Sequence, residues 1–215
     1  MSTRDQVLGR IRRALADTER ETVPARGAVD RGYLRVHGRR DAAETADLLA
    51  ENLADYRAIV HRATGDELPG RLAGLLAARG TRRVVVPPGL PEQWLSAVQG
   101  VEQVADSAGL TARELDAVDS VVTGCAVAIA ETGTIVLDGG PDQGRRRITL
   151  VPDHHVVVVR VPEQVVDSVP QALERLDPVR PLTWISGPSA TSDIELDRVE
   201  GVHGPRTLEV LLVTD

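Results

Sequence analysis

From residue 41 onward, hydrophobic positions follow two alternating patterns: amphipathic stretches with helical spacing and short runs of aliphatic residues. Residues 41–56 and 65–79 have the helical spacing, and Gly80 follows the second stretch as a C-terminal cap. Short aliphatic runs at 58–61 and 83–86 predict strands between and after these helices. Alternating strands and helices favour a mostly parallel sheet with helices on both faces.

The centre of the chain has a different pattern. Three apolar segments, 120–123, 126–130 and 134–137, follow one another with almost no room for helices between them. They predict strands joined by tight turns, so part of the sheet is antiparallel or forms a corner. The rest of the chain predicts strands at 148–151, 155–161, 182–185 and 208–213, a helix at 162–176 with Pro170 as a kink or a break, and a short helix at 192–199. The fold class is therefore α/β, with a mixed, mostly parallel sheet flanked by helices.

The first 40 residues differ from the rest. A helix is predicted to about residue 17, with Val7, Leu8 and Ile11 on one face and several arginines on the others. Residues 19–40 are rich in Pro and Gly and poor in apolar positions, which is typical of a linker. We expect an N-terminal arm at 1–40 and an α/β domain at 41–215. A basic amphipathic helix of this kind packs against its own domain or a neighbouring subunit of a homo-oligomer, or meets a partner or a membrane surface.

Composition excludes several classes of function. All 25 basic residues are arginine, which excludes a Schiff-base lysine and a P-loop lysine. The net charge of −7 and the 2% aromatic content argue against nucleic-acid binding. The single Cys125 suits a small core residue and cannot by itself form a disulfide, a cysteine-ligated zinc site or an iron–sulfur site. No apolar run is long enough for a membrane span, so we expect a soluble, cytoplasmic protein.

A loop rich in Ser, Thr and Gly follows the apolar run at 182–185. A strand, such a loop and a helix start together form an anion site, because free backbone N–H groups point outward there. The alternative is a well-capped helix, since Ser192 and Glu195 have the spacing of a capping box. The candidate ligand-binding residues of this stretch are Ser186, Gly187, Ser189, Thr191, Asp193 and, after a second Gly-rich turn, His203.

Two further candidates lie beside glycine turns. Glu131 and Thr132 follow a buried strand and precede Gly133, and in open α/β sheets the ligand crevice lies beyond strand ends. Glu131 is thus a candidate base, nucleophile or ligand-orienting group, and its alternative is an exposed turn residue. Arg145 comes first in a run of three arginines after Gly144, and its guanidinium has the geometry to clamp a carboxylate or a phosphate.

Two adjacent histidines open the strand at 155–161. Neighbouring strand residues face opposite sides, so only one of the pair faces a given pocket, and His155 is the candidate. His155, His203 and Asp193 include metal-ligating residue types, but no HxH or HExxH spacing supports a metal site, and none is predicted. The chain also lacks the GxGxxG, GxxxxGK[ST], GxSxG and CxxC motifs.

These motifs, taken together and in this order, resemble the LUD-domain family, in its lactate utilization protein C (LutC/YkgG) branch. The matching stretches are AETGTIVL at 130–137, Gly144-Arg145 leading to LVP at 150–152 and His155, ISGPSATSDIE at 185–195, and GVHGP at 201–205. The resemblance covers most of the chain, which uses Arg where relatives often use Lys. It implies a fold similar to the NagB/RpiA/CoA-transferase group and a role, with two iron–sulfur partner proteins, in oxidising L-lactate to pyruvate.

The resemblance leaves the mechanism open. Lactate oxidation needs a redox cofactor, and this chain has no flavin or nicotinamide motif and too few cysteines for a cluster of its own. We therefore expect a non-redox subunit without a bound cofactor that binds a small anionic ligand and docks onto the cluster-bearing partners. Arg145 and the loop at 186–192 would bind the carboxylate, and His155 or His203 would accept the 2-hydroxyl proton. The alternatives are a stand-alone enzyme with CoA-transferase or isomerase chemistry on Glu131, or an assembly scaffold that acts through its N-terminal helix.

Overall fold

The computed structural model describes residues 3–14, 32–191, 199–200 and 204–215. Internal contacts divide the chain into two units, Met1–Leu34 and Arg35–Asp215. The first unit contains helix α1 (Thr3–Ala14), on which Val7 and Ile11 are exposed. The second unit carries all the other helices and strands of the described residues. The boundary between the units falls inside the stretch that composition predicts to be a linker.

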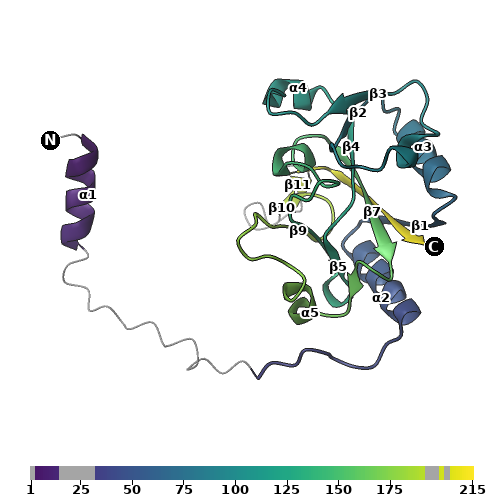
Figure 1. Ribbon diagram of the computed structural model, residues 1–215, viewed down its shortest axis with the longest axis horizontal. Helices are drawn as coiled ribbons and strands as arrows, with labels where there is room; N and C mark the ends of the chain where they lie inside the picture. Colours follow the sequence, from purple (N-terminus) through teal and green to yellow (C-terminus); the bar gives the residue numbers. More distant parts are fainter. Residues whose placement is uncertain (1–2, 15–31, 192–198, 201–203) are drawn as a thin grey trace. The chain divides into compact units, whose positions relative to one another are not determined.

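A six-stranded parallel sheet forms the centre of the second unit (Figure 1). Its strand order is β1-β12-β7-β4-β2-β3, and every neighbouring pair is parallel. The two long central strands are almost entirely buried, as expected for a parallel sheet covered on both faces. The strands are β1 (Ile59–Thr64), β2 (Arg83–Val86), β3 (Glu102–Ala105), β4 (Ser120–Thr123), β7 (His154–Val161) and β12 (Thr207–Thr214).

Helices cover both faces of this sheet, as the sequence predicts. On one face, α2 (Ala42–Asp55) buries Leu49 and Leu53 against Val157 and Val159 of β7. On the other face, α3 (Leu68–Ala78) packs against the alternate residues of the same strand, which include Val158. The alternation follows from the period of two of a β-strand. Smaller elements complete the edge near β3: η1 (Glu92–Leu95), which buries Trp94, and α4 (Ala112–Asp116).

A second, four-stranded sheet has the order β8-β5-β6-β9. Strands β5 and β6 pair antiparallel through the turn η2 (Ala130–Thr132) and Gly133, and β6 pairs antiparallel with β9. The antiparallel region predicted for the centre of the chain is therefore confirmed. The strands are β5 (Val127–Ile129), β6 (Thr134–Leu137), β8 (Val165–Val166) and β9 (Thr183–Ile185), and a separate pair joins β10 (Ala190–Thr191) to β11 (Val199–Glu200).

Two predicted elements are wrong. The apolar run at 148–151 is not a strand, because residues 146–149 form the 3₁₀ helix η3 (Arg146–Thr149), which places Ile148 in a cluster with Val85 and Val121. The long helix at 162–176 is replaced by β8, which pairs with β5, and by the short helix α5 (Val169–Leu173). Pro170 lies at the start of α5 and does not kink it. A short apolar run does not distinguish a strand from a buried helical turn by its periodicity. The predicted helix at 192–199 lies outside the described residues, apart from Val199 in β11.

Candidate functional site

A glycine-rich loop, residues 138–144, lies against the carboxyl ends of strands β2 and β4. Gly89 donates its backbone N–H to the carbonyl of Pro141 at 2.9 Å, and Gly124 donates to the carbonyl of Asp142 at 2.9 Å. A Cβ at Gly89 would lie 2.5 Å from the Cβ of Pro141, and one at Gly124 would lie 2.2 Å from a carboxylate oxygen of Asp142. At Gly89 the backbone of Pro141 leaves no room for a Cβ, whereas at Gly124 the Asp142 side chain could move aside. The two backbone hydrogen bonds hold the loop at the sheet edge where open α/β sheets bind ligands.

This loop forms one wall of a cavity of about 620 Å³, which we call the glycine-loop cavity. Three arginines line it: Arg145, Arg146 and Arg180. Arg180 forms an ion pair of 2.7 Å with Asp138. Arg145 pairs with Asp106. The guanidinium of Arg146, which is exposed, has no hydrogen-bonding or ionic partner in the described part of the chain.

Arg145, the arginine that the sequence predicts as an anion clamp, is engaged with a buried carboxylate. Its Nε donates to Oδ1 of Asp106 at 2.7 Å, and its backbone N–H donates to Oδ2 at 2.9 Å. The Asp106 side chain is only 2% exposed, so it needs this partner. An external anion would have to compete with Asp106 for Arg145, whereas Arg146 carries an uncompensated charge.

A second cavity of about 320 Å³, the Ser186 cavity, lies next to the first. It brings together four residues predicted from the sequence, because Ser186, Gly187 and Ser189 line it with His155. The two cavities share three lining residues, Arg146, Thr149 and Thr183. Among its described lining residues the Ser186 cavity has one cation, Arg146, and no carboxylate.

The Ser186 loop is fixed by contacts on both sides. Gly187 has φ +84°, and a Cβ there would lie 2.2 Å from the backbone oxygen of Tyr56 at the end of α2. The hydroxyl of Ser186 bonds to Thr134 Oγ1 at 2.8 Å, and Thr132 Oγ1 donates to the same atom of Thr134 at 2.8 Å. The backbone N–H of Ser189 donates to Pro205 at 2.8 Å. The loop is thus positioned before any ligand arrives.

His155 lies at the floor of the Ser186 cavity and is 1% exposed. Its Nε2 bonds to the hydroxyl of Thr123 at 2.8 Å. Burial, together with the neighbouring His154, lowers the pKa of His155 to about 3, so the ring is neutral at physiological pH. His154 faces the other way and bonds to Ser120 through Nδ1 at 2.9 Å, which confirms that the pair faces opposite sides.

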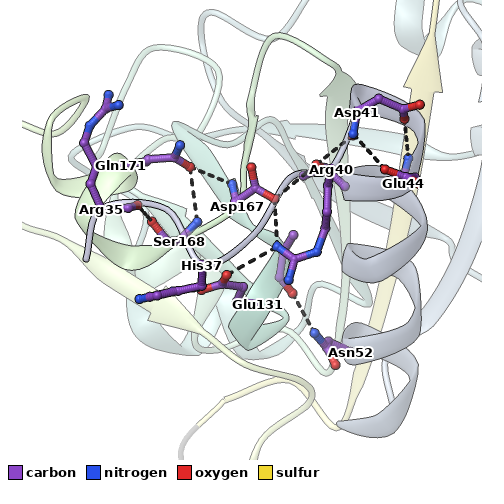
Figure 2. Close-up of polar contacts among 12 residues, drawn as sticks. Arg35, His37, Arg40, Asp41, Glu44, Asn52, Glu131, Asp167, Ser168 and Gln171 are labelled. Carbon is purple, nitrogen blue, oxygen red and sulfur yellow. Dashed lines mark hydrogen bonds and ion pairs between the residues drawn. The ribbon is translucent and has the colours of Figure 1, made fainter. Parts of the chain in front are cut away.

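Glu131 lies outside the described lining of both cavities. Figure 2 shows Arg40 between the carboxylates of Glu131 and Asp167, with contacts of 3.3 and 3.0 Å. The second oxygen of Glu131 contacts Nδ1 of His37 at 2.8 Å. Its side chain is 19% exposed. For Glu131 to act as a nucleophile or base, these contacts would have to open, and that role stays a prediction.

For the remaining candidate residues, the structure gives few contacts that bear on a role in the site. Thr191 lies in β10, and Asp193 and His203 lie outside the described residues. Cys125 is buried, and burial raises the pKa of its thiol, so it stays protonated. The described residues contain no group of three or more His, Cys, Asp or Glu that could hold a metal ion. In the same part of the chain, every helix is too short or too polar to cross a membrane.

Sequence signals identify this loop and cavity only in part. The motif Gly144-Arg145 marks a segment that lines the glycine-loop cavity, but it does not reveal that Arg145 is already paired with Asp106. The ligand-binding role of Arg145 stays a prediction. Asp106 directly follows β3, a strand that the apolar pattern does not reveal, since its residues are largely exposed. Thr149 and Thr183 carry no motif and are found only through the shared wall of the two cavities.

Comparisons with known proteins match most of the chain. A profile of the LUD domain matches residues 46–213. The lactate utilization protein C of Deinococcus radiodurans is 44% identical over 212 residues, which are 97% of this chain and 94% of that protein. The protein of the same name from Geobacillus thermodenitrificans is 32% identical over 198 residues, with 81% and 82% covered.

A solved structure also resembles this one. The crystal structure of a DUF162 family protein from Deinococcus radiodurans aligns with a TM-score of 0.70 and 42% sequence identity, and covers 81% of this chain and 99% of that chain. This similarity and the six-stranded parallel sheet confirm the predicted mixed α/β fold class.

Proposed function

Because the chain belongs to the LUD domain family, as its motifs predict, we propose that it serves lactate utilization as a non-redox subunit that binds a small monocarboxylate. The name of its relatives, lactate utilization protein C, supports the metabolic role. The observation that carries the binding role is Arg146, a guanidinium without an acidic partner in the described chain, on the wall shared by two cavities.

The surroundings of Arg146 suit a carboxylate. A guanidinium binds a carboxylate through two parallel hydrogen bonds, which are stronger than bonds between neutral groups. No described lining residue of the Ser186 cavity is negatively charged, and the neutral ring of His155 adds no competing charge. Thr149 and Thr183 line the same wall. The Thr149 hydroxyl donates to the carbonyl of Arg146 at 2.9 Å, so we assign the contact with the 2-hydroxyl or 2-oxo group of lactate or pyruvate to Thr183.

His155 is the candidate acceptor of the 2-hydroxyl proton. A neutral imidazole has one acceptor nitrogen, and which of the two it is depends on the tautomer. In the tautomer whose Nε2 accepts from Thr123, the Thr123 hydroxyl would have to turn away, or relay the proton, before the ring could act on a ligand; in the other tautomer Nδ1 is the acceptor. In this structure, the hydrogen bond with Thr123 holds the His155 ring in place at the floor of the cavity.

The electrons of lactate would leave through other proteins. The chain has no flavin or nicotinamide motif, and its one cysteine is buried. We therefore assign the redox step to iron–sulfur partner proteins, onto which this subunit docks. A tagged form of the chain should co-purify with the cluster-bearing proteins of the same system. The co-purified complex should oxidise lactate, whereas the isolated chain should not. Lactate oxidation by the isolated, metal-free chain would contradict this assignment.

Calorimetry tests the binding role. We expect the purified chain to bind lactate and pyruvate at millimolar or lower concentration and to bind neutral lactamide far more weakly, because lactamide lacks the carboxylate that Arg146 recognises. The lactamide titration controls for non-specific heat. The proposal fails if lactate and pyruvate give no heat at millimolar concentration, or if lactamide binds equally well.

A further inference from the structure

The glycine-loop cavity is too large for lactate. Its volume of about 620 Å³ lies inside the range of roughly 300–1,000 Å³ in which proteins hold drug-sized ligands. Lactate has a single methyl group beyond its polar atoms and would leave most of this space to water. The tightly packed glycines at 89 and 124 show that the loop bordering the cavity is held in place, so the space is built into the fold.

The charges of the described cavity lining are balanced except for one arginine. Arg145 is neutralised by Asp106, and Arg180 is neutralised by Asp138. Arg146 is the remaining cation of the described lining, so the cavity carries one uncompensated positive charge. A ligand with one carboxylate balances this charge, whereas a phosphate or a dicarboxylate brings more negative charge than the cavity compensates.

Several apolar side chains line the cavity. Leu137 is buried at the end of β6, and Pro88, Ala108, Pro141 and Pro181 surround the same space. Apolar side chains without hydrogen-bonding groups favour a hydrocarbon substituent over a sugar or a second polar group. The cavity thus combines one uncompensated cation with these apolar side chains, and its other charged lining residues are paired with one another.

We propose that the subunit's ligands are 2-hydroxy or 2-oxo monocarboxylates with a bulky apolar side chain, and that the glycine-loop cavity holds this side chain. This inference rests on the proposed function, since it places the carboxylate on Arg146. Arg146, Thr149 and Thr183 line both cavities, so one ligand can place its polar head at the shared wall and its side chain beneath the loop. Lactate would then bind through the same polar head but leave the glycine-loop cavity largely unfilled.

The test compares lactate with 2-hydroxyisocaproate, in which an isobutyl group replaces the methyl group. Each buried CH₂ contributes about 0.8 kcal/mol, so we expect calorimetry to show that 2-hydroxyisocaproate binds roughly tenfold or more tightly than lactate. Ala108 lines the cavity and is exposed, so Ala108→Phe fills the space without disturbing the core. Ala112→Phe, on exposed Ala112 at the start of α4, is the matched control.

Ala108→Phe should bring the Kd of 2-hydroxyisocaproate close to that of lactate, and it should leave the Kd of lactate within about twofold. Ala112→Phe should change neither Kd. Thermal unfolding midpoints close to wild type establish that both variants are folded, and Ala108→Leu serves as a smaller filling variant.

If lactate binds but 2-hydroxyisocaproate binds no more tightly, or if Ala108→Phe leaves the difference between their Kd values unchanged, this inference is overturned and the proposed function stands. If neither acid binds, the proposed function fails and this inference fails with it.

Discussion

Arg145 and Arg146 are neighbours in the chain, but the structure gives them different tasks. Arg145 neutralises the buried carboxylate of Asp106, while Arg146 lines the wall shared by two cavities with its charge uncompensated. The sequence predicts an arginine here because a Gly turn precedes the run, and it does not reveal which side chain is already paired. That depends on Asp106, which is about 40 residues away in sequence and reaches this loop only through the fold.

Gly187 is a second residue whose role depends on close contact. Gly187→Ala should destabilise the protein by about 2 kcal/mol or more, because Ala resists a positive φ and its Cβ would meet the backbone of Tyr56. The free energy of unfolding, measured with urea, checks this. Gly80→Ala is the matched control, since Gly80 also has a positive φ but a Cβ there would meet no atom within 4 Å, and it should cost only about 1 kcal/mol. Equal losses for the two variants would contradict the tight contact.

His155 predicts a specific dependence of stability on pH. Its pKa in the folded protein, about 3, lies below its ordinary value of 6.5, so between these values the unfolded chain takes up a proton that the folded protein does not. Stability is therefore full above about pH 6.5 and falls by about 1.4 kcal/mol per pH unit as the pH drops towards 3.

Comparison of wild type with His155→Gln isolates this contribution. His154, whose pKa is lowered by burial, remains in both proteins and contributes to both curves. Urea unfolding at several pH values between 4 and 7 should show a shallower loss of stability for His155→Gln. Parallel curves for the two proteins would mean that His155 is protonated in the folded state.

At the scale of elements, residues 35–40 open the second unit and contact the rest of that unit through polar groups. Ser168 donates its hydroxyl to the carbonyl of Arg35 at 2.6 Å, and the side chain of Arg35 pairs with Glu174. Arg40 then pairs with Glu131 and Asp167 immediately before α2 begins (Figure 2). This segment therefore holds the Glu131 turn next to the first helix of the domain.

Removing Arg40 should weaken this junction. Arg40→Ala leaves Glu131 and Asp167 close together without their shared cation, so we expect the thermal midpoint to fall by on the order of a few degrees. Arg39→Ala is the matched control, because Arg39 is exposed and has no partner among the residues that the structure describes. The interpretation is contradicted if the two neighbouring variants have the same midpoint.

Most elements can be predicted from the sequence where the apolar pattern is long or clearly bounded. The strand at 83–86, the antiparallel strands of the centre and the two long helices of the domain all lie at or near their predicted positions. The run at 148–151 predicts a strand wrongly, because Ile148 lies in a 3₁₀ helix. It is buried there by contacts with strand residues such as Val85 and Val121. Strand β3 is not predicted from the sequence, because its side chains are largely exposed and do not form an apolar run.

At the scale of the whole molecule, the two sheets create the candidate site where they meet. The glycine loop connects the antiparallel sheet to η3, and β9 of the same sheet leads into the Ser186 loop. His155 comes from the parallel sheet. The fold therefore brings Leu150, His155, residues 185–189 and residues 204–205, which belong to motifs far apart in sequence, to the Ser186 cavity. Glu131 is adjacent to Thr132, whose hydroxyl bonds to Thr134 and through it to Ser186, a relation that no sequence spacing reveals.

The most direct test of the central claim is the calorimetric Kd of pyruvate for wild type, Arg146→Ala and Arg113→Ala. Arg113 is exposed on α4 and has no partner in the described chain, so its variant removes the same charge away from the site. If Arg146 binds the carboxylate, Arg146→Ala should weaken binding by about tenfold or more, as expected for a charge-assisted hydrogen bond, and Arg113→Ala should leave it unchanged. Equal affinities for wild type and Arg146→Ala would contradict the account.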